Sequence, residues 1–170
     1  GHHVDITIGS ETSHLLFGSN SADNLDARGE TQNHILYGGG GDDRLYGGSG
    51  DDILYGGAGH NQLYGGDGND TLYAGKDGDH LYGGAGNDHL YGGAGNDFLD
   101  GGANTFATDH GGNHLNGGEG NDLLVFHQGD TIDGGGDLDM VIVGDGGTVD
   151  TLLRGGVNGA DSNVKNVEVL

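Results

Sequence analysis

The stretch GGAGNDHLYGGAGNDFLD, Gly83–Asp100, contains nearly the same nine residues twice, and this repeat decides the fold. The nonapeptide runs without a break over residues 38–100, in seven copies. The second position is Gly and the eighth is Leu in all seven copies, and the sixth is Asp in six of them. A fixed short period of this kind indicates a solenoid, in which each repeat buries its neighbours.

The spacing of the apolar residues selects strands rather than helices. One Leu in each nonapeptide is too sparse for the apolar face of a helix, and Gly at this density disfavours helix interiors. Collagen would need Gly at every third position together with Pro, and the chain has no Pro. The pattern therefore predicts a short strand, x-Leu-x, followed by a Gly-rich turn that fills the rest of the nonapeptide, with the Leu facing inward.

Two nonapeptides then form one coil with two parallel strands, and the leucines of successive coils stack into a narrow core. The predicted fold class is all-β: a right-handed parallel β-roll, which is a solenoid, with a C-terminal capping segment. We divide the chain into a tag remnant (1–3), an N-terminal cap with degenerate repeats (4–37), the roll (38–142) and a C-terminal cap (143–170). The roll carries a loop insertion at about 104–110. MVIV and VKNVEVL are expected to be strands within or next to the C-terminal cap, and TVDTLLRGG a short helix or turn.

The composition points to a cation as the partner of this chain. Its 170 residues include 42 Gly and 27 acidic residues against 5 basic ones, with no Cys and a net charge of −22. Such a charge disfavours nucleic acid and anionic membranes. A chain so acidic and so poor in apolar residues would by itself be disordered, so something outside it has to stabilise the fold.

The sixth-position Asp follows a Gly-rich turn, which is an arrangement of oxygen ligands. Glycines permit left-handed backbone conformations that turn carbonyl groups to one side. Ca²⁺ takes six to eight oxygens from carboxylates and carbonyls, whereas zinc or copper would need ordered thiolate or imidazole ligands. The repeat therefore predicts Ca²⁺ sites in the turns.

These residues resemble the repeats-in-toxin (RTX) family, whose signature GGxGxDxUx (U large and apolar) matches almost letter for letter. The resemblance implies that each ion lies between two turns on the same edge of the roll, two nonapeptides apart in the sequence. The upstream turn would give carbonyls from positions two and four and its Asp, and the downstream turn carbonyls from positions one and three and its Asp. The side chains so implied are Asp23, Asp43, Asp52, Asn61, Asp70, Asp79, Asp88, Asp97, Asp122 and Asp139. The implied main-chain ligands are Gly39, Gly41, Gly48, Gly50, Gly56, Ala58, Gly65, Gly66, Asp67, Gly68, Gly83, Gly84, Ala85, Gly86, Gly92, Gly93, Ala94, Gly95, Gly118 and Gly120.

We expect about eight Ca²⁺ ions in total. Three departures from the signature weaken individual sites: Asn61 is a neutral ligand, Asp77 replaces a Gly, and Asn113 stands where Asp is expected.

Other features suggest alternatives. All seven Tyr occupy position nine, so Tyr37, Tyr55, Tyr73 and Tyr91 should line one sheet and Tyr46, Tyr64 and Tyr82 the other. These rows would stabilise the sheets by stacking, or dock a ligand. His80 and His89 should face opposite sides of the roll, and we place His114 in a turn or the insertion, so no zinc site is expected. The chain shows no catalytic motif, and we expect no enzyme activity.

The resemblance implies a module that is disordered without Ca²⁺ and folds outside the cell after type I secretion. The tail is similar to the region before the secretion signal of large surface adhesins, which implies a secreted or bacterial cell-surface location and a signal beyond Leu170. We expect a monomeric module of a larger chain, with calcium as partner and no membrane insertion. The alternatives are a module that binds glycan, ice or protein, and the RTX tail of a secreted hydrolase or alginate epimerase.

Overall fold

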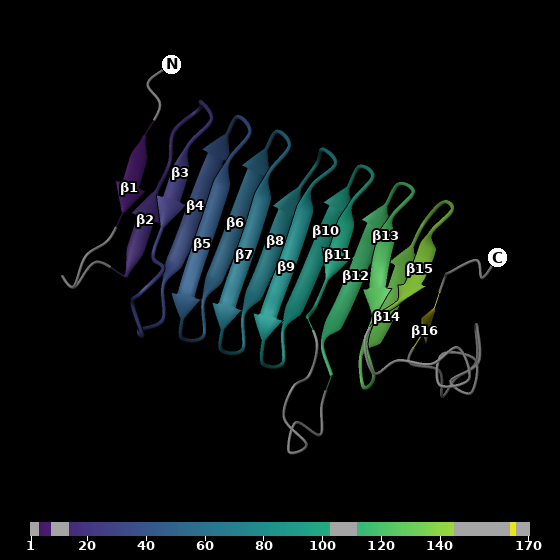
Figure 1. The fold of residues 1–170 in the computed structure, drawn as a ribbon. Helices are drawn as coiled ribbons and strands as arrows, with labels where there is room; N and C mark the ends of the chain where they lie inside the picture. Colours follow the sequence, from purple (N-terminus) through teal and green to yellow (C-terminus); the bar gives the residue numbers. More distant parts are fainter. Residues whose placement is uncertain (1–3, 8–13, 103–111, 145–163, 166–170) are drawn as a thin grey trace.

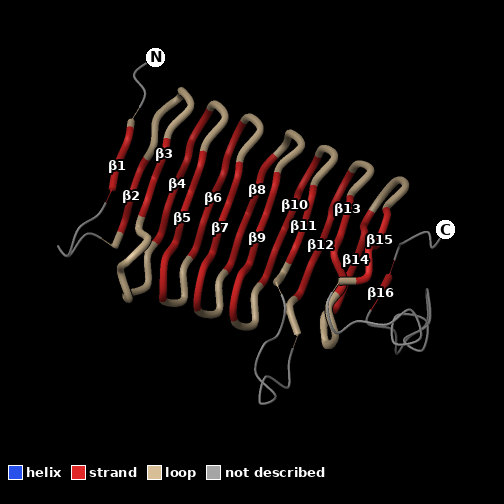
Figure 2. The backbone as a smooth tube through the Cα atoms, in the orientation of Figure 1, coloured by secondary structure: helices blue, strands red, loops and turns tan. Residues whose placement is uncertain are grey.

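The computed structural model describes residues 4–7, 14–102, 112–144 and 164–165, and these form a flat roll of two parallel β-sheets (Figures 1 and 2). The first sheet contains, in order, β1 (Asp5–Thr7), β3 (Asn24–Asp26), β5 (Arg44–Ser49), β7 (Gln62–Asp67), β9 (His80–Ala85), β11 (Phe98–Asp100), β13 (Leu123–Phe126) and β15 (Met140–Val143). The second contains β2 (Leu15–Phe17), β4 (Ile35–Gly40), β6 (Ile53–Ala58), β8 (Thr71–Gly75), β10 (His89–Ala94), β12 (His114–Glu119), β14 (Thr131–Gly135) and β16 (Val164–Lys165). The chain alternates between the sheets with every strand, which confirms the predicted parallel β-roll.

The register confirms a coil of two nonapeptides. Leu45 pairs with Leu63 in the first sheet, and Leu54 pairs with Leu72 in the second, so each Leu meets its equivalent two repeats later. Other coils differ in length. Leu25 pairs with Leu45, Leu90 with Leu115, and Leu115 with Ile132. The inserted segment predicted at 104–110 lies outside the described residues.

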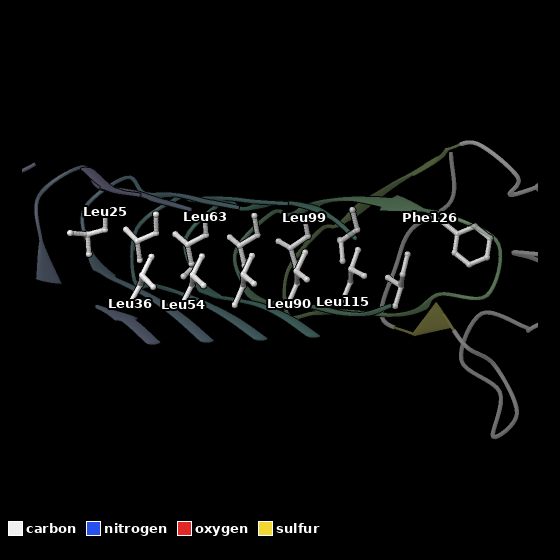
Figure 3. Packing of buried hydrophobic residues seen from close by; sticks show 14 of the residues in the cluster. Leu25, Leu36, Leu54, Leu63, Leu90, Leu99, Leu115 and Phe126 are labelled. Carbon is white, nitrogen blue, oxygen red and sulfur yellow. The ribbon is translucent and has the colours of Figure 1, made fainter. Parts of the chain in front are cut away.

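The core is a double row of leucines between the sheets (Figure 3). Each sheet contributes one Leu per coil, and the side chains of Leu45, Leu54, Leu63 and Leu72 are fully buried. The rows end at Phe126, the largest fully buried side chain. The core is therefore only one side chain per strand wide, so the solvent-facing surfaces and the turns hold a large share of the chain.

The strands are longer than the x-Leu-x triplet that the sequence predicts. Most repeats form a strand that continues through Tyr-Gly-Gly-x, as in the six residues Arg44–Ser49. The glycines pair across coils like ordinary strand residues, Gly48 with Gly66 in the first sheet. The parallel ladder thus runs into what we expected to be turn, because the glycines still donate and accept backbone hydrogen bonds between coils.

The tyrosines line both outer faces as predicted. On the second sheet the rings of Tyr37, Tyr55, Tyr73 and Tyr91 stack with centroids 4.8–5.0 Å apart. On the first sheet Tyr46, Tyr64 and Tyr82 stack at 4.8 and 4.9 Å. The stacked rings therefore cover each other's faces and present their edges to the outside.

Both ends of the roll continue the two sheets. At the N-terminal end β1, β2 and β3 are paired with the following coil, so the segment 4–37 contributes strands of its own. At the C-terminal end β15 contains all of MVIV and β16 contains the first two residues of VKNVEVL, as expected. The predicted helix or turn at TVDTLLRGG lies outside the described residues. The part of the chain that the structure describes has no helix long and apolar enough to span a membrane.

Candidate metal centre

The sixth-position side chains form two rows, one along each edge of the roll, and backbone hydrogen bonds join successive members. The backbone N–H of Asp52 donates to Oδ1 of Asp70, and that of Asp70 to Oδ1 of Asp88, both at 2.8 Å. On the other edge the N–H of Asp79 donates to Oδ1 of Asp97 at 2.7 Å. The His34 row consists of His34, Asp52, Asp70, Asp88, Asn113 and Asp130, and the Asp23 row of Asp23, Asp43, Asn61, Asp79, Asp97, Asp122 and Asp139. Turns on the same edge are therefore neighbours, as the coil of two nonapeptides predicts.

Eight carboxylates in these rows keep one buried oxygen without a hydrogen-bond partner. These atoms are Oδ2 of Asp43, Asp52, Asp70, Asp79, Asp88, Asp97, Asp122 and Asp139. Nearly all buried polar atoms in native proteins are paired, and burying a charged oxygen without a partner is costly. The regular spacing of these oxygens therefore indicates positions for cations.

Main-chain carbonyls of the turns point into the same gap between coils. A Cβ on Gly66 would collide with the carbonyl oxygen of Gly48, and one on Gly68 with that of Gly50, one coil upstream. Both Gly66 and Gly68 have positive φ, +122° and +129°, which side chains disfavour. In the opposite direction, the carbonyl of Asp67 points back and accepts from the N–H of Gly50 at 2.8 Å. Carbonyls of both turns thus converge between the coils.

The ion predicted between the turns at 48–52 and 65–70 shows how the oxygens fit. The carbonyl oxygen of Gly65 lies 2.6 Å from where a Cβ of Gly47 would be, so it also points to the upstream coil. Oδ2 of Asp52 lies 2.5 Å from the same point. Asp70 adds its Oδ1, which accepts from the N–H of Asp52, since its Oδ2 lies beside the carbonyl of Gly83 one coil further on. With the carbonyls of Gly48, Gly50 and Asp67 the site offers six oxygens, the lower limit for Ca²⁺.

The remaining predicted main-chain ligands occupy equivalent places. Each lies in the second half of a strand or in the turn after it: Gly39, Gly41, Gly56, Ala58, Gly66, Gly68, Gly83, Gly84, Ala85, Gly86, Gly92, Gly93, Ala94, Gly95, Gly118 and Gly120. Among the described residues, no three side chains of His, Cys, Asp or Glu gather into a metal site. Any ion in these turns therefore depends on the carbonyls, and the assignment of individual ligands remains a prediction.

The departures from the signature have visible consequences. Oδ1 of Asn61 accepts from the N–H of Asp43 at 2.9 Å, and its Nδ2 donates to the carbonyl of Gly59 at 3.0 Å. An amide NH₂ thus stands where the other repeats keep a bare oxygen, and the arrangement at Asn113 is the same. Oδ2 of Asp77 is already engaged, since it accepts from the N–H of Gly59 at 3.0 Å. We expect these turns to be the weakest of the roll.

Two further row members, Asp23 and Asp130, also differ from the regular pattern, and sequence reasoning missed Asp130. Oδ2 of Asp23 accepts from the N–H of Ser19, so this carboxylate has both oxygens hydrogen bonded. Asp130 is fully buried and extends the His34 row beyond Asn113, with Oδ1 accepting from the N–H of Asn113 at 2.8 Å. Asp130 follows Asn113 by 17 residues instead of 18, so a pattern of nonapeptides does not predict it.

Burial perturbs the carboxylates strongly. Removal from water raises the pKa of Asp70 to about 8 and that of Asp88 and Asp97 to about 7. The same cause raises the pKa of Asp43, Asp79 and Asp122 to about 6, and that of Asp52 and Asp139 in the same direction. Without a cation, the folded protein therefore keeps protons on these carboxylates near neutral pH, whereas the unfolded chain has already released them.

The histidines are arranged differently from our expectation in one respect. His114 begins β12 rather than lying in a turn, and its ring stacks on that of His89 with centroids 5.7 Å apart. The inserted residues displaced the repeat, so position seven of this copy was not recognised. His34 is the other residue that the sequence did not predict, since it occupies position six at the start of the His34 row, where the signature has Asp.

The fold and the turns together define a parallel β-roll whose glycine-rich turns present oxygens to cations. The family model of the RTX calcium-binding nonapeptide repeat (4 copies) matches residues 28–63, 37–72, 46–81, 73–105 and 100–130. These matches join into one span, 28–130, or 103 of the 170 residues. The chain belongs to this RTX family and is a calcium-binding β-roll. No curated protein matches the chain.

Proposed function

We propose that this chain is a Ca²⁺-dependent folding module of a larger secreted protein. Without Ca²⁺ the chain is disordered, and with Ca²⁺ outside the cell it folds into the roll. It serves as a structural part of an adhesin at the bacterial surface, reached by type I secretion. The proposal assigns no catalytic step to the described residues.

The observation that carries the proposal is the set of eight buried Oδ2 atoms without partners. Each of these carboxylates must be neutralised before it can be buried, and a divalent ion shared by two coils does this while also joining them. Because the site exists only when neighbouring coils are stacked, ion binding and folding are the same event. About eight ions would supply about sixteen positive charges, which offsets most of the net charge of −22.

The thin core supports the same conclusion. Only one Leu per strand is buried between the sheets, and much of the remaining chain is Gly, which loses the most backbone freedom on folding. Extracellular Ca²⁺ modules have affinities near 10⁻⁴ to 10⁻³ M, so a chain of this type stays unfolded in the cytosol and folds outside. The low Ca²⁺ concentration of the cytosol would keep the chain in the unfolded form needed for passage through a secretion channel.

The test is circular dichroism during a Ca²⁺ titration after removal of metal with EDTA. We expect a disordered spectrum without Ca²⁺ and a cooperative change to β-structure in the millimolar range or just below. A Mg²⁺ titration serves as control, because Mg²⁺ demands near-ideal octahedral geometry and gives up water reluctantly. A chain that is already β-structured in EDTA at neutral pH would overturn the folding switch.

A second function, ligand binding, is favoured by a groove beside the tyrosines of the second sheet. The groove has a volume of about 300 Å³ and is lined by Tyr55, Tyr73 and Tyr91 along with the glycine stretches that follow them. Since the ring faces are stacked on one another, a ligand would meet ring edges and hydroxyls, which suits hydrogen bonding to a glycan or protein more than stacking under a sugar ring. Tyr73→Phe should keep the stacking and remove a hydroxyl, so lost adhesion with unchanged Ca²⁺ folding would support this function.

A further inference from the structure

The first member of the His34 row is an imidazole, whereas the three members after it are carboxylates. Where the following coils have Asp52, Asp70 and Asp88, this coil has His34. The segment before it, Gly29–Asn33, reads GETQN instead of GGxGx. The acidic ligand and two of the three glycines of the signature are therefore replaced at one end of the row.

His34 and Asp52 form a buried pair. Their side chains are 3% and 0% exposed, and Nδ1 of His34 lies 3.3 Å from Oδ1 of Asp52. Neither Nδ1 of His34 nor Oδ2 of Asp52 has a hydrogen-bond partner. The Asp52 oxygen beside the imidazole, Oδ1, accepts from the backbone N–H of His34 at 2.6 Å, whereas Nδ1 of His34 and Oδ2 of Asp52 are buried and unpaired. This pair lies at the end of a row whose other members present oxygens to cations.

The 3.3 Å between Nδ1 of His34 and Oδ1 of Asp52 suits two ligands of one small tetrahedral metal ion. Zinc binds imidazole nitrogen and carboxylate oxygen at about 2.0–2.2 Å, so two ligands on one tetrahedral ion are about 3.4 Å apart. A second imidazole is close, since the ring of His14 lies 5.8 Å from that of His34, centroid to centroid. Imidazole is a ligand for zinc and similar borderline metals, whereas Ca²⁺ binds oxygen.

We propose that His34 and Asp52 form a site for a divalent transition metal of the Zn²⁺ type, which adjoins the first Ca²⁺ site of this row and shares the Asp52 carboxylate with it. Nδ1 of His34 and a carboxylate oxygen of Asp52 are its two buried ligands. The remaining positions fall to main-chain oxygens of the turn before His34 or to water, because no third His, Cys, Asp or Glu side chain of the described residues joins the pair. The site joins the coil of His34 to the coil of Asp52 at the N-terminal end of this row, as Ca²⁺ would join the coils after it.

The test uses Co²⁺ as a spectroscopic probe for the tetrahedral site, added to the full chain folded in excess Ca²⁺. His2 and His3 are replaced by Gln in all samples, because these N-terminal histidines would bind metal on their own. We expect one equivalent of Co²⁺ with the strong visible absorption of tetrahedral coordination, displaced by one equivalent of Zn²⁺ but not by further Ca²⁺.

His34→Asp restores the residue that the signature has at position six. This variant should lose the Co²⁺ absorption and bind one more Ca²⁺ per chain than the parent, and His34→Gln should lose the absorption without gaining Ca²⁺. His89→Gln, a surface histidine on β10, is the matched control and should keep the Co²⁺ signal. Unchanged Co²⁺ absorption in folded His34→Asp or His34→Gln, or its loss in His89→Gln alone, would overturn the proposal.

The result can be separated from that of the proposed function. If the Co²⁺ site is absent while Ca²⁺ still folds the chain, only this site is disproved. If Ca²⁺ does not drive folding but one equivalent of Co²⁺ binds through His34, the site stands and the folding switch does not.

Discussion

The backbone N–H of Asp70 donates to Oδ1 of Asp88, its equivalent one coil later, at 2.8 Å, while Oδ2 of Asp88 is buried and unpaired. One oxygen of the carboxylate thus holds the coils together and the other remains available to a cation. Since Asp70 stands in the same relation to Asp52, each carboxylate of the row serves the gap before it and the gap after it. The coils are therefore coupled through their acidic side chains, and we expect Ca²⁺ binding to be cooperative along each row.

Replacing Asp70 with Asn should weaken two neighbouring sites at once. Asn can keep the hydrogen bond from Asp52 through its oxygen, but it places an NH₂ group where the cation needs an anion. We expect the Ca²⁺ concentration at the folding midpoint to rise by about tenfold, equivalent to about 1.4 kcal/mol, and up to two ions to be lost. Circular dichroism and isothermal titration calorimetry measure the two quantities.

Asp51→Asn is the matched control, because it makes the same chemical change one position from the row. Asp51 is exposed, and its Oδ1 accepts from the N–H of Asn69 at 2.8 Å, a bond that Asn can also accept. Its Ca²⁺ midpoint should stay close to that of the parent. Equal shifts in the two variants would mean that overall charge, rather than ligation at Asp70, controls folding.

Much of this architecture is readable from the sequence because one period controls it. Leu at position eight and Asp at position six predict which residues become core and which form the edge rows, and Leu54 and Asp70 are placed accordingly. The sequence does not predict the row members where the period is broken. His34 and Asp130 belong to the same row but lie in coils of irregular length, so only the three-dimensional register reveals them.

The free hydrogen-bonding capacity of each atom is the other property that the sequence does not contain. Asp23 and Asp43 occupy the same position of the repeat, but Oδ2 of Asp23 accepts from the N–H of Ser19, whereas Oδ2 of Asp43 is unpaired. That difference arises within a single turn, since Ser19 and Asp23 are only four residues apart, and the repeat pattern does not show which turns make this contact.

The response to pH should have opposite signs for the metal-free and the Ca²⁺-bound protein. Burial raises the pKa of Asp70 to about 8 and of Asp88 and Asp97 to about 7, from about 3.9 in an unfolded chain. The unfolded state therefore releases protons that the metal-free folded state retains. Stability of the metal-free fold is fully present below about pH 4 and is lost as the pH rises through about 6 to 8.

Calcium has to displace these protons, so its binding should tighten over the same range. We expect the Ca²⁺ midpoint to fall steadily as the pH rises from about 5.5 to 8, and the EDTA-treated chain to gain β-structure on acidification. Repeating both series in high salt screens the general repulsion among surface carboxylates but leaves the effect of burial. A Ca²⁺ midpoint that is constant over this range would contradict the protonation of the buried rows.

The second-position glycines should be irreplaceable, and Gly66→Ala tests this. A Cβ at Gly66 would collide with the carbonyl of Gly48, at a φ of +122° that disfavours a side chain. The backbone strain alone costs about 1–2 kcal/mol, and the collision moves a carbonyl that is a predicted ligand. We expect a lower melting temperature in saturating Ca²⁺ and a weaker Ca²⁺ response in the titration.

Gly40→Ala is the control, since Gly40 is at position three, where the repeats at 56–64, 83–91 and 92–100 already have Ala. A Cβ there would meet Asn20 at 3.6 Å, an ordinary contact, and the φ of Gly40 is not in the left-handed region. This variant should be neutral or more stable by about 0.4–1 kcal/mol, because Ala narrows the unfolded ensemble. Similar losses in Gly66→Ala and Gly40→Ala would show that the turn tolerates no side chain and that the direction of the Gly48 carbonyl is not the reason.

Asn61→Asp should improve the roll in Ca²⁺ and harm it in EDTA. In the parent, Nδ2 of Asn61 donates to the carbonyl of Gly59, and the Asp23 row has an amide at this one point between Asp43 and Asp79. An Asp places a second carboxylate oxygen there while still accepting from the N–H of Asp43, so the turns before and after it gain an anionic ligand. We expect the Ca²⁺ midpoint to fall by about threefold to tenfold and the metal-free chain to become less compact at neutral pH, because one more buried carboxylate lacks a counterion.

Asn69→Asp, a change at an exposed residue in position five, is the control: it adds the same charge outside the rows and should leave the Ca²⁺ midpoint nearly unchanged. If both variants shift the midpoint alike, the gain comes from general attraction of Ca²⁺; if Asn61→Asp alone lowers it, the bare carboxylate oxygens of the rows are the calcium ligands.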